Sequence, residues 1–83
     1  MPPRKEPQKT LGLAVRELRT ERGMTQEELA HRSGLHPTWI SRVEGGSMNP
    51  AWSSVMRLCR GLDVPISELA RRVERLEQRS EHS

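Results

Sequence analysis

The sequence lacks the residues on which several classes of protein depend. It contains no phenylalanine, no tyrosine and only one cysteine, Cys59. A single cysteine cannot form an internal disulfide, which excludes the small secreted scaffolds that disulfides hold together. No run approaches the ~18 consecutive apolar residues of a membrane span. No apolar stretch follows the N-terminal charges as it would in a signal peptide. These absences predict a cytoplasmic protein that does not enter the membrane.

Residues that carry catalysis or bind metals are also scarce. His31, His36, His82 and Cys59 do not have the spacing of metal ligands, and no glycine-rich phosphate loop is present. Cys59 is expected in the core. The sequence therefore predicts no enzyme, no catalytic residue, no metal and no cofactor.

What is present suits a small helical domain. Only 33% of the 83 residues are hydrophobic, so one modest core is expected. That core must be built from Leu, Val, Ile and Ala with Trp39 or Trp52, which favours short packed helices over a large sheet. The net charge of +3 permits a polyanionic partner without requiring one, because acidic residues are interspersed.

Turn and capping residues divide the chain into helices. Residues 1–9, MPPRKEPQK, hold three of the six prolines and no apolar periodicity, so they are predicted to form a disordered basic arm. The first helix stops at Gly23. Thr25 and Glu28 form a capping box that opens the second helix, and Gly34 ends it.

Three further helices follow. The third has Pro37 in its first turn and ends at two glycines. Asn49, as the cap before Pro50, is expected to open the fourth helix. The inward face of that fourth helix is predicted to hold Trp52, Val55, Leu58, Cys59 and Leu62. The fifth helix is expected over residues 65–79, with residues 80–83 as a disordered tail.

The segment from Thr25 to Glu44, TQEELAHRSGLHPTWISRVE, has the pattern of a helix-turn-helix unit. Ala30 is small where two helices would cross, and Gly34 tolerates the positive φ of the turn. Ile40 anchors the second helix, and the buried wedge is completed by Leu29, Leu35 and Val43. A plain helical bundle with a matching turn is the alternative.

The run LGLAVRELRTERGMTQEELAHRSGLHPTWISRVEGG, followed by NPAWSSVMRLCRGLDVPISEL, resembles the Xre-type helix-turn-helix family, which includes repressors of the lambda and 434 type. The resemblance covers about seven-tenths of the chain. It implies an all-α, five-helix DNA-binding domain over residues 10–70, with the helix-turn-helix at helices 2 and 3. Helix 3 would enter the major groove of double-stranded DNA, usually as a homodimer on a near-palindromic operator.

The function implied is a sequence-specific transcriptional regulator without a small-molecule effector domain. The alternative is a protein-interaction module, a bridging factor or an antitoxin-like protein, built on the same fold.

The resemblance also assigns roles to residues. Thr38 and Arg42 lie four apart on one face of helix 3, and Arg42 can form a bidentate bond with guanine. With His36 and Ser41 they are the expected base-reading residues. An ion pair with a nearby glutamate is the alternative for Arg42.

Other positions are expected to contact the DNA backbone or to hold the domain together. Gln26 at the start of helix 2, Trp39 and Asn49 are expected at phosphates. Packing inside the domain is the alternative for Trp39. Arg19 and Glu44 match a partly buried salt bridge of the family, and their alternative is two exposed charges.

The sequence also departs from the family. Residues 45–48, Gly-Gly-Ser-Met, stand where relatives often carry cations, which predicts weaker phosphate contact. Asp63 stands where glycine is usual at the end of the fourth helix.

The fifth helix carries a heptad-like seam. Ile66, Leu69, Val73 and Leu76 are spaced three, four and three residues apart. Val73 and Leu76 are expected to lie beyond the edge of the domain and to be left in water. We therefore predict a dimer interface of Leu69, Val73 and Leu76, with a frayed helical tail as the alternative.

Overall fold

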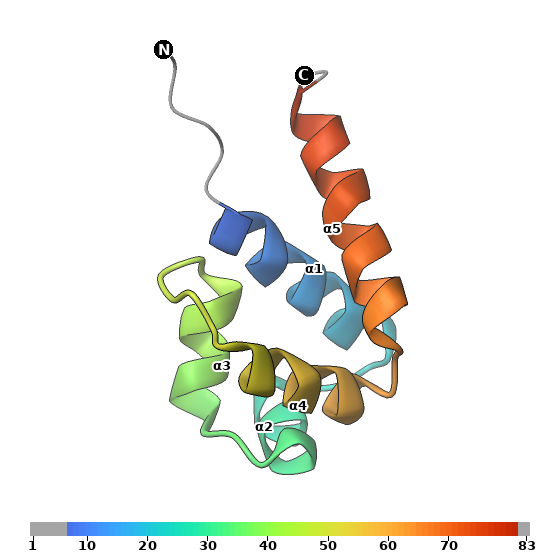
Figure 1. The fold of residues 1–83 in the computed structure, drawn as a ribbon. Coiled ribbons are helices and arrows are strands. Elements are labelled where there is room, and N and C mark those ends of the chain that lie inside the picture. The colour runs from blue at the N-terminus through green and yellow to red at the C-terminus, as the bar shows by residue number, and fades with distance from the viewer. Residues whose placement is uncertain (1–6, 82–83) are drawn as a thin grey trace.

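The computed structural model describes residues 7–81 and, within that range, contains five helices and no strand (Figure 1). The helices are α1 (Pro7–Glu21), α2 (Gln26–Ser33), α3 (Pro37–Glu44), α4 (Trp52–Leu62) and α5 (Ile66–Glu81). α2 packs against α3 and α4, while α1 packs against α3 and α5. The predicted all-α, five-helix class is confirmed.

Local signals place the helix ends as the sequence predicts in the helix-turn-helix segment. The Thr25 hydroxyl accepts a hydrogen bond from the Glu28 amide at 3.0 Å, and the Glu28 carboxylate accepts one from the Thr25 amide at 3.2 Å. This reciprocal capping box starts α2. Gly34 ends α2 with a φ of 71°, in the left-handed region that glycine adopts without steric cost.

The core lies where the five helices meet. Its largest fully buried apolar side chains come from every helix, and they are Val15, Leu18, Leu29, Ile40, Val43, Leu58, Leu62 and Leu69. Cys59 is 3% exposed and belongs to this core. Burial raises the pKa of the Cys59 thiol, which keeps it protonated and unreactive.

The predicted start of the fourth helix is wrong. Asn49 and Pro50 lie in a segment without regular structure, because a residue before proline is forced into extended backbone. α4 begins at Trp52, and its N-cap is Ala51, which makes no side-chain capping bond. The predicted inward position of Trp52 is also wrong, since 66% of this residue is exposed.

The limits of the first and last helices differ from prediction as well. α1 begins at Pro7, so residues 7–9 are helical rather than part of a disordered arm. Proline fits a first helical turn, where its missing amide would have no partner. The rest of the predicted arm, residues 1–6, lies outside the described residues. α5 continues to Glu81, two residues past the predicted limit, and residues 82–83 lie outside the described range.

The apolar seam of α5 is covered by the domain itself. Leu69 is 2% exposed and belongs to the core, while Val73 and Leu76 are half-buried against it. The expectation that Val73 and Leu76 are left in water is therefore wrong. The reason is that α5 lies along α1, where the Arg72 guanidinium bonds the carboxylates of Glu17 and Glu21.

Candidate nucleic-acid interface

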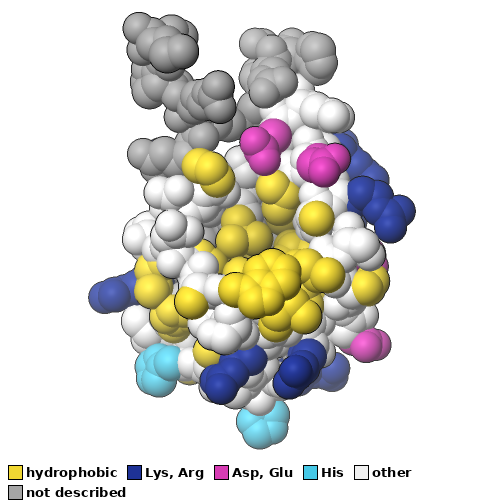
Figure 2. All heavy atoms as spheres, viewed as in Figure 1, with side chains coloured by type: hydrophobic (Ala, Val, Ile, Leu, Met, Phe, Trp, Pro, Cys, Tyr) yellow, Lys and Arg dark blue, Asp and Glu magenta, His cyan; other side chains and the backbone are white. Residues whose placement is uncertain are grey.

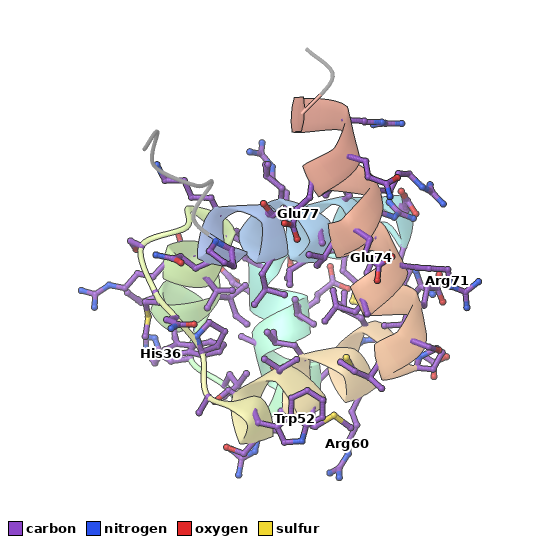
Figure 3. The ribbon with its side chains drawn as sticks, turned by 45° about the horizontal axis from the view of Figure 1, so that its top comes forward. His36, Trp52, Arg60, Arg71, Glu74 and Glu77 are labelled. Carbon is purple, nitrogen blue, oxygen red and sulfur yellow. The ribbon has the colours of Figure 1, made fainter. Side chains whose placement is uncertain are left out.

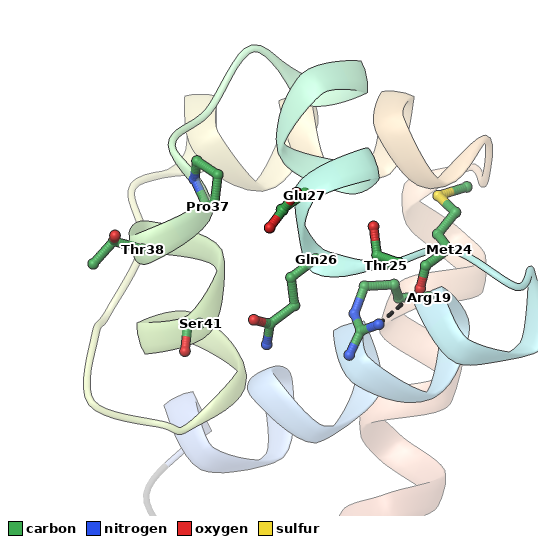
Figure 4. A pocket seen from close by; sticks show the side chains of 8 residues that line it. All are labelled: Arg19, Met24, Thr25, Gln26, Glu27, Pro37, Thr38 and Ser41. Carbon is green, nitrogen blue, oxygen red and sulfur yellow. Dashed lines mark hydrogen bonds between the residues drawn. The ribbon is translucent and has the colours of Figure 1, made fainter.

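α2 and α3 present their N-termini to one open groove. A concavity of about 640 Å³ lies between them (Figure 4). The residues that line it come from α1, α2, α3 and the loop between α1 and α2, and they are Arg19, Met24, Thr25, Gln26, Glu27, Pro37, Thr38 and Ser41. Helix N-termini offer unpaired amides and partial positive charge, which suits an anionic ligand.

Glu44, the last residue of α3, ties three helices together beside this groove. Its Oε2 accepts a hydrogen bond from Arg19 Nε at 2.6 Å, and its Oε1 accepts one from Arg19 Nη2 at 2.9 Å. The same Oε1 accepts a bond from Gln26 Nε2 at 3.1 Å. Arg19 also donates from Nη1 to the Met24 carbonyl at 2.7 Å. Side chains from α1 and α2 thus hold the C-terminus of α3.

This network is largely withdrawn from solvent. The side chains of Arg19 and Glu44 are only 12% and 4% exposed. The hydrogen bond to Glu44 raises the pKa of the Arg19 guanidinium, although burial opposes that shift. Such a bidentate pair is geometrically specific, so it sets the angle between α1 and α3 as well as holding them together.

Two glycines permit close helix contacts that the sequence analysis did not identify. A Cβ on Gly12 of α1 would lie 2.2 Å from the Val43 carbonyl oxygen and 2.8 Å from that of Glu44. A Cβ on Gly61 of α4 would lie 2.9 Å from Leu29 Cδ1. A glycine inside a helix costs about 1 kcal/mol relative to alanine, so its presence at such positions is itself a signal of close packing.

α3 is capped by a side chain expected to read DNA. His36 Nδ1 accepts a hydrogen bond from the Thr38 amide at 3.1 Å and acts as the N-cap of α3. An accepting Nδ1 carries no proton, so the neutral ring is assigned its hydrogen on Nε2. His36 is exposed, which leaves an Nε2–H donor directed away from the cap.

The other predicted base-reading residues lie on the outer surface of α3. Thr38, Ser41 and Arg42 are exposed, and Thr38 and Ser41 line the groove. Arg42 is not part of the groove wall, but it lies one helical turn after Thr38 on the same face. The structure therefore brings Thr38 and Ser41 together with Gln26, and places Arg42 at the far end of the α3 face.

The residues predicted at phosphates occupy three different environments. Gln26 is half-buried and donates to Glu44. Trp39 is half-buried and packs against the core, which is the alternative raised from the sequence. Asn49 is exposed in the loop between α3 and α4.

A cation near the groove was not identified from the sequence. Arg16 is exposed on α1 and lines a second hollow together with Gln26, Ser41 and Gly45. Its spacing of three residues before Arg19 could have suggested that both share one side of α1. A basic side chain at this position can contact a phosphate that approaches α3.

Other kinds of site find no support in the part of the chain that the structure describes. Over residues 7–81, no group of three His, Cys, Asp or Glu side chains could hold a metal ion. In the same range, none of the helices is both long and apolar enough to cross a membrane.

Comparison with known proteins agrees with this architecture. A family model described as a helix-turn-helix domain matches residues 10–72. An uncharacterised HTH-type transcriptional regulator, y4dJ of Sinorhizobium fredii, is 38% identical over 61 residues, which cover 74% of this chain and 79% of that protein. The control protein C.SmaI of Serratia marcescens is 36% identical over 58 residues, which cover 70% of this chain and 69% of its own.

A solved structure is similar over most of its length. The restriction-modification controller protein C.Esp1396I, determined as a tetramer with its natural 35-base-pair operator, superposes with a TM-score of 0.85. It is 28% identical, and the match covers 89% of this chain and 97% of that one. The relatives named here are regulators and controllers rather than enzymes. The family match over residues 10–72, together with the fold, shows that this chain belongs to the helix-turn-helix family and confirms the Xre-type resemblance.

Proposed function

We propose that this protein is a sequence-specific DNA-binding transcriptional regulator that inserts α3 into the major groove. The observation that carries the proposal is the pair of helix N-termini that open onto one groove, beside an α3 whose outer face is polar and whose position is held by Arg19 and Glu44. The family match and the controller protein bound to its operator support the same conclusion.

The start of α2 is the main proposed contact with the phosphates of the DNA backbone. Gln26 lies at the first position of that helix, where the backbone amides and the helix dipole attract an anion. Because its Nε2 already donates one hydrogen to Glu44, the amide is oriented before DNA arrives. The exposed Arg16 adds a positive charge on the same side. Asn49 in the loop after α3, and the accessible part of Trp39 on α3 itself, extend this contact with the DNA backbone.

Base reading is assigned to the exposed side chains of α3. Arg42 forms a bidentate bond with the O6 and N7 of guanine, and Thr38 contacts a thymine methyl group or a base acceptor. Ser41 lies between them on the groove side. His36 donates from Nε2 to a base acceptor or a phosphate while its Nδ1 keeps the cap.

The protein is proposed to act in the cytoplasm as a homodimer on a near-palindromic operator. Two recognition helices related by a two-fold axis must lie about one turn of DNA apart, which selects an inverted repeat. The tetramer of C.Esp1396I in complex with its operator is a precedent for the assembly of several copies on one DNA site.

Selection of bound duplexes from a random pool at physiological salt tests the proposal. Enrichment of an inverted repeat is expected. On the selected site, Arg42→Ala should reduce affinity by about 1–3 kcal/mol and relax one base position. Arg71→Ala is the matched control, because Arg71 is an exposed arginine on α5, outside the groove. Equal losses for both variants at every sequence would refute the assignment of Arg42 as a reader.

The second candidate function is a protein-interaction module on the same fold. Two observations favour it: residues 45–48 carry no cation after α3, and the large apolar side chain of Trp52 is exposed. Failure to enrich any DNA sequence, combined with intact folding, would move the conclusion to this function.

A further inference from the structure

Four arginines lie on one side of α5. Arg71, Arg75 and Arg79 follow one another at intervals of four residues, and all three are exposed. Arg72 lies between the first two, and at roughly 3.6 residues per turn the four side chains project from a sector of about 100°. The outer side of α5 is therefore strongly basic, and the name arginine row is used for Arg71, Arg75 and Arg79.

The acidic residues in the middle of α5 lie on a different side of the helix. Figure 3 shows Glu74 and Glu77 over the front of α5 and Arg71 directed away from them. In Figure 2, acidic side chains face the viewer near α5 and basic ones stand at its outer edge. Like charges four residues apart destabilise a helix, and the arginine row contains two such pairs. The row is therefore not a device for stabilising α5, and it favours an anionic partner outside the helix.

The domain itself does not supply that anion. Among residues 7–81, the side chains of the arginine row form no hydrogen bond or salt bridge. Arg72 differs, because its guanidinium bonds the carboxylates of Glu17 and Glu21 on α1. This bond fixes α5 against α1, so the row is presented on a rigid element.

The row borders a shallow hollow at the start of α5. A concavity of about 250 Å³ is lined by Pro65, Glu68, Arg71, Arg72 and Arg75. Glu68 is the one acidic residue of this lining, and three guanidinium groups surround the same space. Guanidinium groups bind the oxygens of a phosphate through pairs of parallel hydrogen bonds. The hollow therefore suits a phosphate group.

Positive charge continues from the groove between α2 and α3 to the arginine row. Met24 lines that groove, and Arg22 is exposed two residues earlier, in the loop after α1. The hydrogen bond from Arg72 is the main cause that lowers the pKa of the Glu21 carboxyl. The charges of Arg22 and Arg75 lower it further, so both lie near the end of α1. A DNA strand that leaves the groove past this loop meets Arg22 and then Arg75.

We propose that Arg22 and the arginine row bind phosphates of DNA beyond the segment that α3 reads. The inference rests on the proposed function and deepens it by adding a second DNA-binding surface on α5. DNA is favoured over an acidic protein segment because the row continues from the groove. A phosphate contact carries no base information, so this surface adds affinity and salt dependence without selectivity. Arg71→Ala should therefore weaken binding alike at every sequence, in contrast to Arg42→Ala.

The experiment compares two duplexes of different length. One ends at the edge of the selected operator, and the other extends it at each end by about 10 base pairs, which is one turn of DNA. The affinity of the full chain for each duplex is measured over a range of salt concentrations. Each phosphate contact adds about 0.9 to the slope of log affinity against log salt. For wild type, the slope should therefore be steeper on the extended duplex.

Two arginines of the row are then replaced. The variant R71A/R75A should lose about 1.8 of the slope per bound copy on the extended duplex and nothing on the short one. R71K/R75K keeps both positive charges and should keep the slope. Arg72 is left in place because it joins α5 to α1. The replaced residues are exposed, so the variants are expected to fold, which far-UV circular dichroism checks.

The matched control removes the same number of charges elsewhere. Arg57 and Arg60 are exposed arginines of α4, and Figure 3 shows Arg60 directed away from α5. Neither lines the hollow at the start of α5 or the groove between α2 and α3. R57A/R60A should therefore keep the wild-type slope on both duplexes.

The outcomes separate this inference from the proposed function. A wild-type slope for R71A/R75A on the extended duplex overturns the inference and favours an acidic protein partner for the row. An equal loss for R57A/R60A also overturns it, because total charge would then explain the effect. Selective binding with equal slopes on both duplexes refutes the inference alone. If no sequence is selected, the same two lengths of an arbitrary duplex are used. A slope lost only by R71A/R75A then upholds the inference and refutes the proposed function.

Discussion

Arg19 and Glu44 form a bidentate, nearly buried ion pair that joins α1 to the last residue of the proposed recognition helix. The pair has two consequences. It compensates two charges that would otherwise be costly to bury, and it orients Gln26 at the start of α2 through the shared Glu44 Oε1. The Glu44 carboxylate therefore both holds α3 against α1 and orients the Gln26 side chain that is proposed to contact DNA.

Removal of that carboxylate should be strongly destabilising. Glu44→Ala leaves Arg19 without its partner at 12% side-chain exposure, and we expect a loss of about 3 kcal/mol in the free energy of unfolding. Urea denaturation measures the loss, with Glu27→Ala at an exposed glutamate as the control. The double variant R19M/E44M should recover part of the stability, because it leaves no unpaired charge. A double variant less stable than Glu44→Ala would contradict this explanation.

Gly12→Ala should displace α3. The added methyl group would lie 2.2 Å from the Val43 carbonyl oxygen, which belongs to a backbone that cannot rotate away. We expect a net loss of about 1–3 kcal/mol, even though alanine favours the helix. Thermal unfolding measures this change. DNA titration should show that specific affinity falls more than non-specific affinity. Leu13→Ala, on an exposed neighbour, is the control; unchanged stability of Gly12→Ala would show that α1 and α3 separate easily.

Asp63 is expected to gain stability on replacement by glycine. It is the only non-glycine residue with positive φ in the described part of the chain, with φ 57° and ψ 46° at the C-cap of α4. Relief of the left-handed strain should exceed the entropy cost of glycine in the unfolded chain, for a net gain of about 0.5 kcal/mol. Asp63→Ala should lose stability instead. Opposite signs in urea denaturation are the required result, and a loss for both variants would assign Asp63 a role other than its backbone conformation.

The ion pairs between α1 and α5 should make the protein sensitive to acid. The hydrogen bond from Arg72 lowers the pKa of the Glu21 carboxyl below its usual value of 4.5 and raises that of the Arg72 guanidinium. A carboxyl with a lowered folded-state pKa contributes stability above its unfolded pKa and loses it as the pH falls through the folded value. Stability should therefore decline below about pH 4.5 less steeply in Glu21→Gln than in wild type. Equal slopes in urea denaturation across this pH range would show that the exposed pair contributes nothing.

Two substitutions at His36 separate its two roles. Asparagine retains a side-chain cap for the Thr38 amide but cannot reach DNA as the imidazole Nε2 does, while alanine provides neither. His36→Ala should lose about 1 kcal/mol of stability, whereas His36→Asn should stay near wild type. Both should bind the selected operator more weakly if Nε2 contacts DNA. Wild-type affinity of a stable His36→Asn would leave His36 with the capping role alone.

Local signals predicted the helix-turn-helix segment well. The capping box of Thr25 and Glu28 and the turn at Gly34 depend on residues close in sequence, so the pattern was sufficient to place them. The same kind of signal failed at Asn49, where Pro50 holds the chain extended and the helix starts later, at Trp52. The roles given to the α3 residues in DNA binding remain predictions.

The sequence by itself determined that the described chain forms five helices, although not all of their limits. It also determined the turn at Gly34 and the side chains of α3 that stay polar, because these depend on contacts within one or two turns of the chain. Only the tertiary structure decided which apolar side chains are covered. Val73 and Leu76 became half-buried because α5 lies along α1, whereas Trp52 stayed exposed because α4 begins there, at the surface of the domain. Burial depends on which helices meet, and helical spacing alone does not specify that.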